Sequence, residues 1–191
     1  LGSPHLEAFK EKGYEVLLFT DPVDEVWVQF SREAKGKKFQ AVSKGKVELG
    51  NEEERKKAEE TRKEKESTFK SLLEAIKTKL DDQVKEVRLS SRLTSSPACL
   101  VGEVNEMSFH MEALLKASGK ETPKVKRVLE VNPTHPIIEK LQSIFEKDKN
   151  DPRIGDFADL LFGQALLAEG APLPAPGLFS KKLTELMIKV L

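Results

Sequence analysis

Apolar side chains near the end of the chain recur at steps of four, three and four residues. With Met187 widening the stripe, these positions are Phe179, Leu183, Leu186, Met187 and Val190. The spacing places them on one face of a helix, as in helices that pair with each other. A second stripe at helical spacing lies upstream and consists of Ile154, Phe157, Leu160, Leu161 and Ala165. Both helices must bury these faces, either against the core of this chain or against a second copy of it in a four-helix bundle.

The start of the chain carries the pattern of a helix, a buried strand and one further element. Residues 4–12 look helical, the apolar run within 14–20 predicts a buried strand, and residues 23–30 predict another short element. So short a segment cannot build a core around a buried strand. We therefore interpret residues 1–30 as the end of a larger α/β domain.

Residues 31–50 carry three glycines and are typical of a connector, with one weak hairpin. From residue 51 to residue 66, thirteen of sixteen residues are charged, with both signs mixed. Mixed signs indicate a solvated helix face rather than a basic tract for nucleic acid. The same helix gains an apolar face toward Leu80, and we place a separate domain over residues 51–191.

Residues 87–94 alternate between apolar and polar side chains, which predicts a half-buried strand with Arg88 and Arg92 on its polar side. Further strands are predicted at 98–101 and 124–131. One helix is predicted before Asn150 and another after it. The pattern predicts an α+β fold of two layers. A small, mainly antiparallel three-stranded sheet is covered by helices, and two helices end the chain.

A separate helix is predicted between Asn105, a suitable N-cap, and Gly119, a suitable residue after the C-cap. Its apolar stripe consists of Met107, Met111, Leu114 and Leu115. Such a stripe usually belongs to a core helix. Polar loops on both sides and the two flexible methionines instead favour an exposed helix that binds other proteins, and both interpretations remain open.

Composition and motifs narrow the function classes. Lys and Arg balance Asp and Glu at 32 each, so no net charge attracts nucleic acid or an anionic membrane. No run approaches eighteen apolar residues, and the single cysteine, Cys99, cannot form an internal disulfide, so we expect a cytoplasmic protein. The three histidines lack ligand-spaced partners and no phosphate-binding glycine motif is present. We predict no catalytic, cofactor-binding or metal-binding residues.

Several strings together resemble one family. They are SPHLE at 3–7, EVLLF at 15–19, VRLSSRLT at 87–94, PACLV at 97–101, LEVNPTHP at 129–136 and LFGQALLAEG at 161–170. In this order they resemble the C-terminal part of heat-shock protein 90 chaperones. The chain is most similar to the bacterial type, because it stops at Leu191 without the acidic Met-Glu-Glu-Val-Asp tail of eukaryotic cytosolic members.

The resemblance implies a function. Members are ATP-driven clamps that assist protein folding under stress, and their ATP and magnesium site lies in an N-terminal domain, so this chain alone would be neither an ATPase nor cofactor-bound. Residues up to about 30 would end the middle domain, and the rest would form the homodimer through the two terminal helices. The Met107–Leu115 helix would bind unfolded or partly folded client proteins, with Phe109 at a variable position and Trp27 of unresolved role. The alternative is a scaffold or adaptor that binds one specific partner.

Overall fold

The computed structural model describes residues 2–31, 33–121 and 125–190. Its centre is a three-stranded sheet in the order β3 (Val84–Leu89), β5 (Arg127–Val131), β4 (Ala98–Val101). β5 pairs with β4 in antiparallel and with β3 in parallel orientation, so the sheet is mixed, with only one of its two ladders antiparallel. The α+β class is confirmed. The third strand begins later than predicted, and Lys124, its expected first residue, lies outside the described part of the chain.

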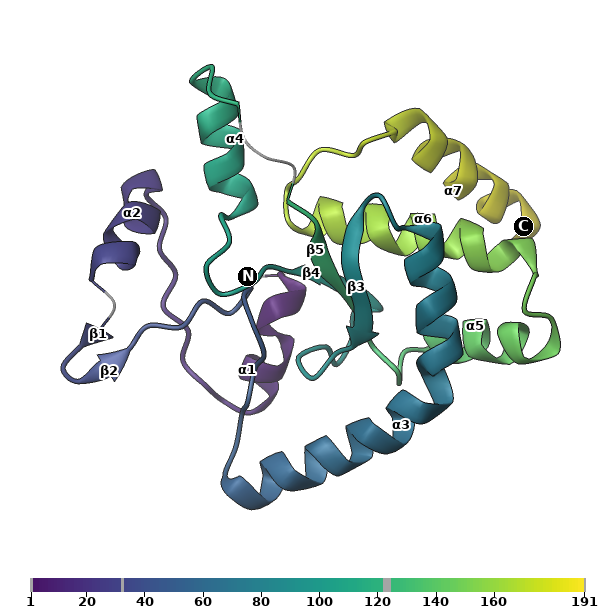
Figure 1. The fold of residues 1–191 in the computed structure, drawn as a ribbon, viewed down its shortest axis with the longest axis horizontal. Coiled ribbons are helices and arrows are strands. Elements are labelled where there is room, and N and C mark those ends of the chain that lie inside the picture. The colour runs from purple at the N-terminus through teal and green to yellow at the C-terminus, as the bar shows by residue number, and fades with distance from the viewer. Residues whose placement is uncertain (1, 32, 122–124, 191) are drawn as a thin grey trace.

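Helices cover one face of this sheet and make the main core. α3 (Glu52–Lys79) packs against β3, α6 (Pro152–Ala168) packs against β4, and α5 (Pro136–Lys147) contacts both helices. Figure 1 shows α7 (Pro176–Val190) running beside α6 at the end of the chain. The fully inaccessible apolar residues of the core are Leu72, Ile76, Leu80, Val84, Leu129, Val131, Ile138 and Ala158.

The long helix follows its predicted pattern. Asn51 caps α3, because its side-chain oxygen accepts a hydrogen bond from the Glu54 backbone at 2.9 Å. The charged first half is exposed, and burial begins at Phe69. Tertiary packing of the apolar half therefore stabilises the whole helix, whose charged first half is surrounded by solvent.

The first residues dock onto the sheet domain. A 3₁₀ turn, η1 (Pro4–Leu6), leads into α1 (Glu7–Glu11), and His5 Nε2 lies 2.5 Å from Glu169 Oε1 at the end of α6. The Glu7 carboxylate accepts hydrogen bonds from the backbone amides of residues 94–96 and from the Ser96 hydroxyl, at 2.5 to 3.1 Å. These contacts cross the predicted domain boundary, whose position stays a prediction.

The buried strand predicted at 14–20 is wrong. Residues 14–20 form no strand, and Leu17 is 69% exposed. A strand needs a neighbour to receive its backbone hydrogen bonds, and among the described residues no strand lies beside this run. The following element is the helix α2 (Pro22–Phe30), and the weak hairpin is present as β1 (Glu33–Ala34) and β2 (Lys37–Lys38).

The polar position predicted for Arg92 is also wrong. β3 ends at Leu89, and the Ser90 hydroxyl accepts hydrogen bonds from the Arg92 and Leu93 backbones, which turns the chain and ends the alternation. Arg92 is completely buried, and its Nε donates to Glu130 at 2.9 Å. Its other nitrogens donate to the carbonyls of Val42 and Gly45, which fastens the second half of the connector to the domain.

Candidate functional site

One helix projects from the domain with no buried residue. α4 (Phe109–Ala117) extends away from α3 and α5 in Figure 1. Its N-cap is Ser108, whose hydroxyl accepts from Met111 at 3.0 Å, so the predicted N-cap Asn105 is wrong by three residues. The C-terminal end is as predicted: Gly119 has φ 78°, and the backbones of Gly119 and Lys120 bond to Lys116 and Leu115.

The four residues predicted to bind clients do not all lie on α4. Met111, Leu114 and Leu115 are on the helix, where Leu114 is 45% exposed and the other two are half-buried. Met107 precedes the helix and is also half-buried. Because α4 buries none of its side chains, the interpretation as a core helix is ruled out. The helix can present Met111, Leu114 and Leu115 to another protein.

A side chain of β5 holds the N-terminal end of α4 and the segment just before it; residues 107–112 are called the root of α4 below. Arg127 is 6% exposed, and its Nη2 donates to the Met107 carbonyl at 2.8 Å and to Glu112 Oε1 at 2.6 Å. Its guanidinium carbon lies 3.8 Å from the centre of the Phe109 ring. Phe109 therefore has a structural place at the base of the helix, and sequence reasoning missed Arg127 because nothing local links it to α4.

A second candidate surface runs along α6 and α7. The α7 stripe is divided by its contact with α6: Phe179 and Leu186 are half-buried, whereas Leu183 is 44% and Met187 58% exposed. Exposed Ile188 lies about 140° around the helix from Leu183, outside the predicted stripe. The side chain of Val190 lies outside the described part of the structure.

The α6 residues of the predicted interface separate into two groups. Ile154, Leu161 and Ala165 are at most 5% exposed and belong to the core of this chain, so a second copy cannot contact them in this arrangement. Phe157 and Leu160 are half-buried and remain accessible. Helical spacing alone could not separate these groups, because α6 has apolar residues around much of its circumference.

A glycine and an ion-pair network fix α7 against α6. Gly163 on α6 lies under the Phe179 ring, where any side-chain carbon would come within 2.5 Å of the ring. Lys182 on α7 reaches Asp156 at 2.8 Å and Asp159 at 2.5 Å. Burial lowers the pKa of Lys182, but the hydrogen bonds and charges of the two carboxylates outweigh burial and raise it. The cation thus stays charged where the helices meet.

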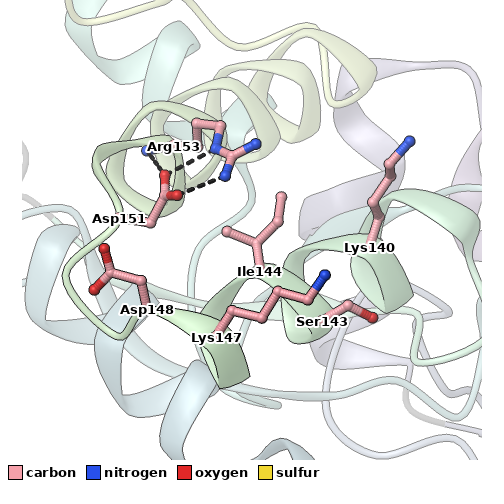
Figure 2. Close-up of a pocket in the computed structure, with 7 residues that line it drawn as sticks. All are labelled: Lys140, Ser143, Ile144, Lys147, Asp148, Asp151 and Arg153. Carbon is pink, nitrogen blue, oxygen red and sulfur yellow. Dashed lines mark hydrogen bonds and ion pairs between the residues drawn. The ribbon is translucent and has the colours of Figure 1, made fainter.

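One surface pocket is lined mainly by charged side chains. This pocket lies between α5 and the start of α6 (Figure 2) and has a volume of about 430 Å³. Asp151 caps α6 there and binds the Arg153 guanidinium at 2.6 Å; chiefly the Arg153 hydrogen bonds hold the pKa of Asp151 at about 2. Asp151 therefore serves as the cap of α6, and its carboxylate also holds the Arg153 guanidinium in an ion pair.

Other candidate chemical groups have structural partners. His135 caps α5, and His5 pairs with Glu169. Burial raises the pKa of the Cys99 thiol. Within residues 2–31, 33–121 and 125–190, no cluster of three His, Cys, Asp or Glu side chains could hold a metal ion. None of the helices described is both long and apolar enough to cross a membrane.

Comparison with known proteins gives one consistent result. The family model described as Hsp90 protein matches residues 1–191. The chain is 48% identical over 189 residues to the chaperone protein HtpG of Frankia casuarinae, covering 99% of this chain and 29% of the relative. It is 50% identical over 181 residues to HtpG of Rhodococcus jostii, covering 95% and 28%. The chain thus spans less than a third of the length of these relatives.

Proposed function

The chain belongs to the Hsp90 family, and we propose that it is the homodimerisation module of a cytoplasmic bacterial chaperone of the HtpG type. The observation that carries this proposal is the exposed apolar strip on α7, formed by Leu183 and Met187, together with the half-buried Phe157 and Leu160 on the neighbouring helix α6. Two copies packed through this strip would cover it in a four-helix bundle. The module would join two longer chains as a clamp and keep their remaining parts at high effective concentration.

The dimer is tested by light scattering coupled to size exclusion at micromolar concentration. The wild-type chain is expected to elute as a dimer, and Leu183→Glu/Met187→Glu as a folded monomer, since both side chains are already exposed within one chain. Lys181→Glu is the matched control, because it also changes the charge by two and lies about 160° around α7 from Leu183. A wild-type monomer, or a control that dissociates as readily as the double variant, would refute this interface.

We further propose that α4 binds unfolded or partly folded clients through Met111, Leu114 and Leu115, with Met107 beside them. The lack of any buried side chain on α4 supports this role. Methionine and leucine side chains adapt to varied apolar segments, which suits weak and promiscuous capture.

Client binding is tested by following the aggregation of a thermally unfolding reporter enzyme by light scattering. The wild-type chain should slow aggregation, and Met111→Asp/Leu114→Asp should lose most of this effect. Lys116→Asp changes the charge by the same amount on another side of α4 and should retain it. Saturable binding of one protein with no general suppression of aggregation would favour the adaptor instead.

We assign nucleotide hydrolysis to parts of the parent chaperone that this chain does not include. The expectation rests on the family resemblance, since this chain corresponds to less than a third of its relatives. Titration calorimetry with ATP and magnesium should give no binding heat. Saturable binding would contradict the assignment.

A further inference from the structure

We propose that Arg127 is a positioning residue that sets the direction of α4, and that releasing it lets the helix pivot. The inference rests on the proposed client-binding role of α4. Arg127 reaches three successive parts of the root: the Met107 carbonyl before the helix, the Phe109 ring at its first residue, and the Glu112 carboxylate one turn later. Contacts spread over a full turn restrain the helix axis, whereas a single contact would leave it free to rotate.

The attachment starts from the central strand of the sheet. Arg127 opens β5, the central strand of the sheet, and is registered opposite Val84 of β3. Its ion pair with Glu112 is shielded from water, as both side chains are at most 13% exposed. Shielding strengthens the pair and makes the loss of either partner disruptive. Arg127 thereby fixes the direction of α4 relative to the sheet.

The geometry requires arginine. One guanidinium donates to two acceptors and lies over an aromatic ring at the same time, because it is planar and carries several donors. A lysine would offer a single ammonium and could not keep all three contacts. Arginine at this position is therefore a specific choice for orienting α4.

Gly102 makes room for the guanidinium. A side-chain carbon at Gly102 would lie 2.9 Å from Arg127 Nη1, closer than such atoms approach in proteins. Gly102→Ala should therefore displace the Arg127 guanidinium without removing the positive charge from the protein. This substitution tests the position of the guanidinium independently of its removal.

The other contacts near the root hold the preceding loop. Lys44 Nζ donates to the Glu106 carbonyl at 2.5 Å, and the Glu103 backbone donates to Glu106 Oε2 at 2.7 Å. Both contacts act before the helix begins at Phe109. Phe109 also packs against the main core of the domain. Loss of Arg127 should therefore leave the loop and the first residue of α4 attached, and allow the rest of the helix to change direction about them.

The test is a spin-label distance between α4 and the domain. Labels at Ala113→Cys on α4 and Glu139→Cys on α5 occupy exposed positions, and Cys99 is too buried to react. The labelled chain is mixed with excess unlabelled chain, so that any dimer carries one labelled copy. Double electron–electron resonance should give one narrow distribution for the parent protein.

Arg127→Gln and Gly102→Ala are expected to broaden this distribution roughly twofold, and Arg127→Lys to fall between. Arg88→Gln is the matched control, because Arg88 lies in the same sheet and, among the described residues, its side chain bonds to Glu130 and not to α4. An unchanged width in folded Arg127→Gln, or equal broadening in the control, would overturn the proposal. The distance does not depend on client capture, so failure of the proposed function would leave this result standing.

Discussion

Gly163→Ala should separate the two terminal helices, and its cost can be worked from the contact that it disturbs. The added carbon would lie 2.5 Å from Phe179 Cδ2 and 2.7 Å from Cε2. Favourable carbon contacts lie at about 3.5–4.0 Å, so the overlap is about 1 Å. Phe179 is held between α7 and α6, and α7 must therefore move outward.

Two opposing terms set the magnitude. Replacing glycine by alanine inside a helix stabilises it by about 1 kcal/mol. Overpacking of a close contact costs about 1–3 kcal/mol. The net result is a loss of about 1 kcal/mol of unfolding free energy, and the structural consequence is that the Phe179 ring becomes more exposed to solvent.

Gly155→Ala supplies the matched control on the same helix. Its added carbon would lie 3.5 Å from Lys79 Cε, an ordinary contact, so only the helix term of about 1 kcal/mol applies and the variant should be more stable than wild type. The two substitutions should thus differ by about 2 kcal/mol in opposite directions.

The assay is urea unfolding followed by circular dichroism, at two protein concentrations so that any association is separated from folding. Phe179→Leu added to Gly163→Ala removes the overlapping ring atoms and should recover part of the loss as a coupling energy. If Gly163→Ala proves as stable as Gly155→Ala, the close packing of α7 on α6 inferred here is incorrect.

Three other predictions test residues that join the segments of the chain. Burial raises the pKa of Glu7, but the hydrogen bonds of residues 94–96 outweigh it and lower the pKa from 4.5 to about 2. The stabilisation of the fold by the ionised Glu7 carboxylate should be complete above pH 4.5 and disappear as the pH falls toward 2. In urea titrations at a series of pH values, Glu7→Gln should remove this acid dependence and cost about 1–2 kcal/mol of unfolding free energy at pH 7. Arg92→Met should cost about 3–5 kcal/mol of unfolding free energy and speed proteolysis near Val42, because Glu130 loses a buried partner. Arg153→Met, at an exposed pair, should leave the urea midpoint almost unchanged. Cys99 should resist alkylation in the native protein and react in urea; a native reaction at the rate of a free thiol would contradict its burial.

Much of the local structure was predictable, since it follows from neighbouring residues. Residue spacing predicted that the charged first half of α3 is exposed and that its apolar second half is buried. Capping preferences predicted that α4 ends at Gly119. The helical nature of α6 and α7 followed from their apolar period. The start of α4 was misplaced because Ser108 and Asn105 are both good N-caps, and only the turn between Glu103 and Glu106 leaves Ser108 to begin the helix.

For most of the chain, the sequence by itself determined which segments are helices or strands and which faces are apolar, because these depend on side chains a few positions apart. Residues 14–20 are the exception: they have the pattern of a strand, but no described strand lies beside them to pair with. Only the tertiary structure decided what those faces contact. It placed Ile154, Leu161 and Ala165 of α6 in the core and left Leu183 and Met187 of α7 exposed, although each set follows the same helical spacing within its own helix. It also buried Arg92 against Glu130 and set Arg127 beneath α4, because these contacts join residues 15 to 38 positions apart that only the folded sheet brings together.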